Sequence, residues 1–285
     1  MKIIVILLVL WSINIKADIS LMFDNDTFAK TDRYYTHGTK LSYQYNDINY
    51  SLIQLIYTPH NATVFDTSEH DRPYCGWLYF NLTKITQNNN DYRSWGLDIG
   101  TVGPNSYANE TQTLVHKLIN NRLPCWNNEI KNELGINILY NRKYKIYKNR
   151  WFDFIPSYNA SIGNIHTYIN IATSLRFGLI PDDFRTTKIE PTLRISPNFN
   201  NQYNIYTILM IEQRLVGRNI SLDGNTFKSN NFDIHKNIFV SELSMGLGII
   251  IHRFDLVYLY TIKTKEFKEQ PNHSEYGSVQ LNFKF

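Results

Sequence analysis

The stretch of sequence that decides the fold is the last one, Ser278-Val279-Gln280-Leu281-Asn282-Phe283-Lys284-Phe285. Its apolar side chains occupy every second position, so they share one face of an extended strand, and the polar side chains share the other. Strands with an apolar face toward lipid and a polar face toward a lumen build the walls of membrane barrels. The stretch therefore predicts a strand in a β-barrel wall.

The same period of two recurs in residues 77–83, 152–163 and 254–263, although the second face of the last segment is less polar. Any one segment would also fit a half-buried strand of a soluble sandwich. Their recurrence favours an all-β, transmembrane, antiparallel up-and-down barrel of about twelve strands, an even number. The strands should begin near Ile19, Thr36, Tyr50, Gly76, Tyr92, Gly135, Phe152, Tyr168, Tyr203, Ile238, Phe254 and Gly277.

Residues 1–17 have the pattern of a secretory signal peptide. Lys2 precedes an apolar core from Ile3 to Leu10, and Ala17 offers a small residue for cleavage. The apolar run is too short to cross a membrane as a helix. We therefore expect a signal peptide over 1–17 and a single outer-membrane barrel over 18–285.

Composition limits the classes of function and the partners that the chain could have. Aromatic residues make up 14% of the chain and the net charge is +4. The aromatic share suits rings of aromatic side chains at both membrane interfaces, and without a dense Lys/Arg run nucleic acid is a poor partner. Cys75 and Cys125 are the two cysteines of the sequence. In an exported chain they could form a disulfide or remain two small unpaired residues.

Two stretches depart from the strand pattern. Residues 105–121 predict a helix in an outward loop, capped by Asn105 or Ser106, which could lie against the wall at the depth of the outer leaflet. Gln112 and His116 are four residues apart and so project from one face of that helix. The connection 178–202 should be a short periplasmic turn, yet it is long and contains three prolines. It could hide a strand piece or a plug.

The richest polar cluster lies where the first strand ends and the second begins. It reads Asp24-Asn25-Asp26-Thr27-Phe28, then Thr31-Asp32-Arg33-Tyr34-Tyr35-Thr36-His37-Gly38. Its carboxylates, carboxamide and hydroxyls can hold a hard cation, although the acids could equally be solvated turn residues. Alternation places Thr36 on the polar face of its strand. It also points Asn25 and Asp26 to opposite faces unless the strand end bulges.

This cluster and several later motifs, in chain order, resemble the outer-membrane lipid A 3'-O-deacylase family. The later motifs are Asp71-Arg72-Pro73-Tyr74, Gly100-Thr101-Val102-Gly103-Pro104, Gln112 with His116, Asn132-Glu133 and Arg218-Asn219-Ile220-Ser221-Leu222-Asp223-Gly224-Asn225. The resemblance implies a twelve-stranded barrel and calcium-dependent hydrolysis of the ester that carries the 3'-linked acyl chain of lipid A. It implies essential roles for the residues matching Asn25, Asp26, Thr36 and His116. Cys75 and Cys125 depart from the family, which usually has Ala and Gly there.

The expected roles follow from ester chemistry. His116 is the best general base, because imidazole titrates near neutral pH. Asp26 is the first choice as a Ca²⁺ ligand, and Asn25 could supply a ligand oxygen or an oxyanion contact. Thr36 and Gln112 could orient a water or the substrate. Asn132 and Glu133 rank lower, as residues that brace the helix loop.

The partners expected are lipid A or lipopolysaccharide and the outer membrane, with a monomeric chain whose site faces the outer leaflet. Alternatives remain open. The barrel could be a non-enzymatic porin or adhesin, or a binding module without turnover. A serine hydrolase would use the adjacent His273 and Ser274, with Glu275 beside them. Asp71 and Arg72 could form only a surface ion pair, and Gly224 should shape a turn.

Overall fold

The computed structural model describes residues 17–29, 33–184, 203–229 and 232–284. The predicted signal peptide lies outside these ranges except for Ala17, which opens the first strand. Thr31, Asp32 and Phe285 also lie outside them. No helix in the described ranges is both long enough and apolar enough to cross a membrane.

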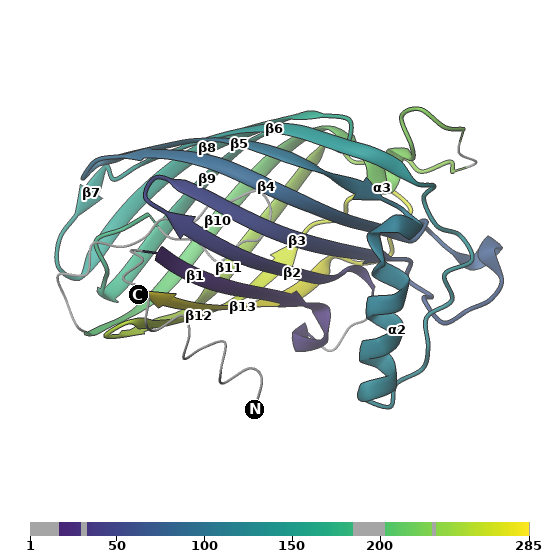
Figure 1. Cartoon of the computed structure of the whole chain (residues 1–285), viewed down its shortest axis with the longest axis horizontal. Helices are drawn as coiled ribbons and strands as arrows, with labels where there is room; N and C mark the ends of the chain where they lie inside the picture. The colour runs from purple at the N-terminus through teal and green to yellow at the C-terminus, as the bar shows by residue number, and fades with distance from the viewer. Residues whose placement is uncertain (1–16, 30–32, 185–202, 230–231, 285) are drawn as a thin grey trace.

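Twelve long antiparallel strands in the described residues close into a barrel (Figure 1). β1 pairs with β13, and β6 pairs with β8, which completes the ring. A short β7 (Tyr147–Lys148) adds to the edge of β8. The long strands are β1 Ala17–Asn25, β2 Tyr34–Tyr45, β3 Ile48–Thr58, β4 Cys75–Gln87, β5 Asp91–Val102, β6 Glu133–Tyr144, β8 Phe152–Gly163, β9 His166–Leu179, β10 Tyr203–Asn219, β11 Phe239–Ile251, β12 Phe254–Lys263 and β13 Ser274–Lys284.

The predicted barrel is confirmed, and its faces follow the alternation of the sequence. In β13, Leu281 is 49% exposed on the outside, whereas Gln280 and Asn282 are buried in the lumen. The less polar inner face of β12 is also real, because Leu259 packs against Ile208 and Met210 inside the barrel. The period of two therefore identifies wall residues correctly even where the lumen is partly apolar.

Short helices lie in the outward connections: η1 (Asp26–Ala29), η2 (Thr67–Glu69), η3 (Pro104–Ser106), α2 (Ala108–Leu118) and α3 (Ile220–Asp223). The helix predicted over 105–121 is α2, but its expected caps are wrong. Tyr107, in a left-handed conformation, occupies the N-cap without a side-chain cap bond. The reason is that η3 takes up Asn105 and Ser106, and the backbone N–H of Asn105 donates to Asn132 Oδ1 instead.

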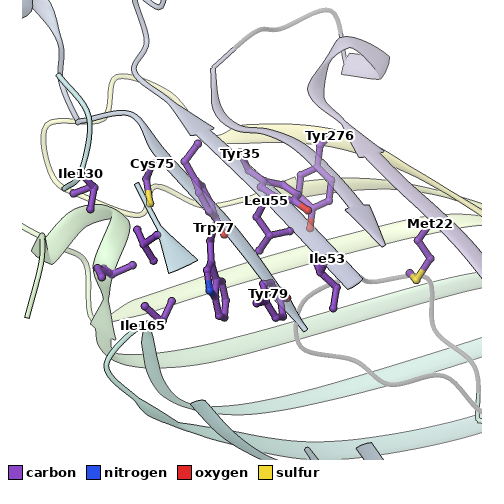
Figure 2. Close-up of a cluster of buried hydrophobic side chains, with 13 residues drawn as sticks. Met22, Tyr35, Ile53, Leu55, Cys75, Trp77, Tyr79, Ile130, Ile165 and Tyr276 are labelled. Atoms are coloured by element: carbon purple, nitrogen blue, oxygen red, sulfur yellow. The ribbon is translucent and has the colours of Figure 1, made fainter. Parts of the chain in front are cut away.

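Aromatic side chains fill the lumen at the level of the outward loops (Figure 2). Trp77 stacks on Tyr79 with 3.8 Å between ring centroids. Nearby, the ring of Tyr35 packs against those of Tyr57 and Tyr276. This cluster gives the barrel a packed core on the lumen side of the strands that carry the polar motifs.

The opposite end of the lumen is also filled. Residues 180–184, the described start of the long connection, fold inward after β9. Arg176, fully buried, donates to the carboxylates of Asp153 and Asp183. Phe184 packs beside Ile85, Tyr92 and Ile155. This part of the connection is a plug, as one of the two sequence interpretations proposed, and residues 185–202 lie outside the described ranges.

Candidate functional site on the outer wall

A β-bulge decides the position of Thr36. The register between β2 and β3 shifts between Tyr35 and His37, so Thr36 is the extra residue. Its Oγ1 lies 2.6 Å from Oγ1 of Thr58, which follows the lumen-facing Tyr57 and so faces outward. The expectation that Thr36 shares the lumen face of Gly38 and Lys40 is therefore wrong, because the bulge breaks the alternation.

Asn25 and Asp26 lie where β1 gives way to η1. Asn25 is paired with His37, whose ring packs edge-on against the exposed Phe23, so Asn25 is on the outer face. Its Oδ1 accepts from the backbone N–H of Thr27 at 2.7 Å. Asp26 begins η1, so strand alternation no longer governs its direction. Its buried carboxylate accepts from the backbone N–H of Arg33 at 2.6 Å.

The helix η1 folds back over the outside of the barrel. Phe28 packs directly on Gly277 of β13, where a Cβ atom would clash with the ring. Its ring also meets those of Phe23 and Tyr258 edge-on. Asp26 and the end of β1 are thereby held at the outer surface of the wall.

The helix α2 lies across the outward ends of β3 and β4 (Figure 1). Gln54 on the outer face of β3 donates to the backbone oxygen of Ser106 at 2.7 Å. Gly76 on the outer face of β4 leaves just enough room for Ser106 and Ala108. Gln112 and His116 are buried on the same face of α2 as Ala108. The helix thus turns polar side chains toward the wall.

Hydrogen bonds determine the tautomer of His116 and the orientation of the Gln112 amide. Nδ1 of His116 bonds to the backbone oxygen of Arg122, and since a carbonyl only accepts, Nδ1 carries the proton. In the neutral ring Nε2 is then the basic nitrogen. Gln112 Oε1 accepts from Trp126 Nε1 at 2.9 Å, and its buried Nε2 has no hydrogen-bond partner in the described ranges. Gln112 therefore presents a donor.

The strand order explains how these elements converge. In the sheet the order is β4, β3, β2, β1, β13. Of the two helices, α2 contacts β3 and β4 and η1 contacts β2 and β13. They flank the outer face of β1 and β2, where Asn25 and Thr36 lie. The four residues that the family resemblance marks as essential thus all lie on the outer side of the barrel wall.

Asn132 and Glu133 join neighbouring loops. Glu133 Oε1 accepts from Asn164 Nδ2, and Oε2 accepts from the backbone N–H groups of Thr226 and Phe227. Asn132 Oδ1 accepts from Asn105. The Asn132 bond is consistent with the expected bracing of the helix loop, whereas Glu133 ties the start of β6 to two other loops.

Asp71 and Arg72 do not form a surface ion pair. Asp71 accepts from the hydroxyl of Tyr34 at 3.0 Å, whereas Arg72 turns into the barrel and is fully buried. There Arg72 donates to Ser221 Oγ at 2.7 Å and lies 3.7 Å from Glu266. The expectation of an Asp71–Arg72 pair is wrong because the two side chains point to different partners.

Three smaller expectations are also decided. Gly224, at φ 76°, ends α3 and so shapes a turn as predicted. Cys75 and Cys125 are both buried and are not joined by a disulfide. For the serine alternative, the ring of His273 bonds to Glu275, while Ser274 Oγ accepts from Gln270 at 3.1 Å. These bonds direct the imidazole away from the hydroxyl.

Three further residues lie around the site. Thr58 and Trp126 bond to Thr36 and Gln112 across long sequence separations. Glu129, in the loop after α2, has its pKa raised to about 7 by burial and by the nearby charge of Glu110. Thr58 belongs to no short motif, so sequence reasoning did not single it out.

Comparison with known protein families identifies the family of the chain. The family model described as outer membrane protein LpxR matches residues 3–285. The chain belongs to this family. Membership confirms the lipid A deacylase resemblance and supports an outer-membrane lipid A deacylase. Together with the twelve-stranded barrel it supports a location in the outer membrane.

One solved structure has the same fold. LpxR from Salmonella typhimurium has a TM-score of 0.81 and 20% identity, covering 94% of this chain and 100% of that one. The β domain of the Bordetella autotransporter BrkA has a TM-score of 0.44 and 9% identity, covering 94% of this chain and 98% of that one. The NanC porin has a TM-score of 0.40 and 6% identity, with the same coverage of 94% and 98%. No curated protein sequence matches the chain significantly.

Proposed function

We propose that the chain hydrolyses the 3'-linked ester of lipid A in a calcium-dependent reaction, releasing the 3'-acyloxyacyl group. The reaction takes place on the outer face of β1 and β2, in the outer leaflet. One observation carries the proposal: α2 buries Gln112 and His116 against the wall and exposes a stripe of leucine and valine side chains.

The exposures of α2 are the reverse of those of a helix on a soluble protein. Leu118 is 77% exposed, Leu114 59% and Val115 39%, whereas Gln112 and His116 are 4% and 6% exposed. In water the apolar stripe would face the core. An apolar stripe facing outward fits the boundary between headgroups and acyl chains. A lipid ester at that depth would reach the polar face of α2 from the side.

The oxygen donors at the end of β1 fit Ca²⁺. Asp26 offers a carboxylate and Asn25 a carboxamide, and Ca²⁺ prefers oxygen ligands supplemented by backbone carbonyls and water. No three His, Cys, Asp or Glu residues gather in the described ranges. The ion would be held by the Asp26 carboxylate together with neutral oxygens. When bound, it would polarise the ester carbonyl and offset the charge that develops on its oxygen.

The protein groups perform the proton transfers. His116 Nε2 takes a proton from water as the water oxygen bonds to the carbonyl carbon. The bond between that carbon and the sugar oxygen then breaks, and the sugar oxygen receives the proton from His116 Nε2. The products are a carboxylic acid and a free 3'-hydroxyl. The Nε2 donor of Gln112 and the hydroxyl of Thr36 orient the water or the substrate.

The packing of the lumen disfavours the porin alternative. The aromatic cluster around Trp77 fills one level, and residues 180–184 with the buried Arg176 fill another. An adhesin or a binding module without turnover would leave lipid A unchanged. These alternatives therefore differ from the proposal in one measurable product.

Mass spectrometry of lipid A tests the proposal. Cells that express the chain should yield lipid A lighter by one acyloxyacyl unit at the 3' position, and cells without it should not. Membranes treated with a calcium chelator should keep the intact species, and added calcium chloride should restore the loss. Unchanged lipid A in every sample would rule out the hydrolase.

A further inference from the structure

A buried side-chain bond links the two strands that carry the candidate site. The last paired residues of β1 and β2 are Asn25 and His37. Just beyond this pair the bulge begins, and on the lumen side the hydroxyl of Tyr35 donates to Asp24 Oδ2 at 2.8 Å. Both residues are buried, with exposures of 6% and 2%. The bond therefore ties β1 to β2 at the point where regular pairing stops.

The two bonded residues are next to the candidate residues in sequence. Asp24 immediately precedes Asn25 and Asp26, and Tyr35 immediately precedes Thr36. The lumen side of this backbone holds the bond, and its outer side holds the amide and the hydroxyl. A shift of either strand end would therefore move Asn25 and Thr36 relative to each other.

The surroundings make Tyr35 rigid. Its ring centroid lies 5.5 Å from that of Tyr57 and 4.9 Å from that of Tyr276, within the packed aromatic cluster (Figure 2). A second link comes from the residue that precedes β2, because the carboxylate of Asp26 accepts from the backbone N–H of Arg33. The strand ends are thus fixed from both sides of the wall.

We propose that Tyr35 is a positioning residue that acts through Asp24. By fixing the bulge and the end of β1, it holds the Thr36 hydroxyl and the oxygens of Asn25 and Asp26 in one arrangement. This inference rests on the proposed hydrolysis, because it assigns these three residues to one substrate ester. A displacement of about 1 Å at a reacting group can cost on the order of a hundredfold in rate.

The chain offers a matched control. Tyr276 is also 6% exposed, belongs to the same cluster, and donates its hydroxyl to Glu242 at 3.2 Å. Y276F and Y35F each remove one buried hydroxyl and keep the ring, but only Y35F breaks the link to Asp24. D24A removes the acceptor, and D24N retains a carbonyl oxygen that can still accept.

Steady-state kinetics on refolded, heat-modifiable protein provide the first test. Y35F and D24A should lower kcat by about ten- to a hundredfold, with KM within about twofold of wild type. D24N and Y276F should stay within about threefold of the wild-type kcat, and the double variant Y35F/D24A should be no slower than D24A. Equal losses in Y35F and Y276F, or no loss in Y35F, would overturn the positioning role.

Calcium titration separates this inference from the proposed reaction. With calcium chloride as the sole ligand in calorimetry, Y35F should bind several-fold more weakly than wild type, on the scale of a lost outer-shell partner, and Y276F should bind equally. If wild type binds calcium but does not deacylate lipid A, the proposed reaction is ruled out. The comparison of calcium affinity between wild type and Y35F still tests the role of Tyr35. Identical affinities in wild type and Y35F, or no binding by wild type, would contradict the link to Asn25 and Asp26.

Discussion

Oγ1 of Thr36 lies 2.6 Å from Oγ1 of Thr58, and both side chains are buried on the outer side of the wall. Thr58 therefore holds the hydroxyl of the bulged residue in a single orientation. Because the extra residue of a bulge leaves the regular alternation of its strand, this pair explains how Thr36 can face away from the lumen.

The Thr36–Thr58 pair leads to a graded prediction. T36V should reduce kcat more than tenfold, because it removes the hydroxyl that we propose orients the water or the substrate, within the range of about 10²–10³ for loss of a positioned donor. T58V should cause a smaller loss, since Thr36 keeps its hydroxyl, and T36S should retain most activity. Kinetics on the three purified variants provide the measurement. A greater loss in T58V than in T36V would show that the assignment is reversed.

The exposed stripe of α2 should matter only in a bilayer. L118D places a charge on the most exposed apolar side chain of the helix, which we expect to lift α2 out of the acyl region. Deacylation in lipopolysaccharide-containing liposomes should then fall by about tenfold or more, while activity in detergent micelles changes little. K117A, at the neighbouring exposed position, is the control. Equal activity of L118D and K117A in liposomes would show that α2 does not contact acyl chains.

Glu129 predicts a stability that depends on pH. Burial and the charge of Glu110 raise its pKa from 4.5 to about 7 in the folded chain. A raised carboxyl pKa means that folding favours the protonated form, so its stabilising effect is full below pH 4.5 and is lost as the pH rises through about 7. E129Q should therefore have a higher Tm than wild type at pH 8 and the same Tm at pH 4. An equal difference in Tm at both pH values would indicate that ionisation of Glu129 is not responsible.

Arg72 should be a stability residue, although it belongs to a family motif. Its side chain is inaccessible to solvent and faces the buried Glu266 and Ser221. R72M leaves the Glu266 charge with less compensation, and breaking a buried pair typically costs about 3–5 kcal/mol. R72M/E266Q should recover part of this loss. Denaturant unfolding in detergent provides the measurement, and a double variant less stable than R72M would contradict the coupling.

The sequence predicts the wall because alternation is a local property of a strand. Every long strand begins within three residues of its expected position, the largest difference being Ser274 against Gly277. The helix face of Gln112 and His116 is equally local, since it depends only on spacing. Residue spacing therefore identifies the polar face of the helix, but it does not identify the strands β3 and β4 that the helix packs against.

The features that sequence did not reveal are tertiary. A single inserted residue at Thr36 reverses the face of every earlier residue in β2, and no local motif marks it. Arg72 finds Ser221 149 residues away. The N-cap of α2 is displaced because η3 forms against Gly76 and Asn132, residues from other strands and loops. In each case the deciding partner is distant in the chain.

One measurement tests the central claim most directly: product analysis of purified lipid A incubated with wild type and with H116A, both shown to be folded by heat-modifiable migration. Wild type should release the 3'-acyloxyacyl acid. H116A should be slower by about 10²–10⁴-fold, the contribution expected of a general base. Release of the same acid by H116A at the wild-type rate would contradict the assignment of His116 and, with it, the site on the outer wall.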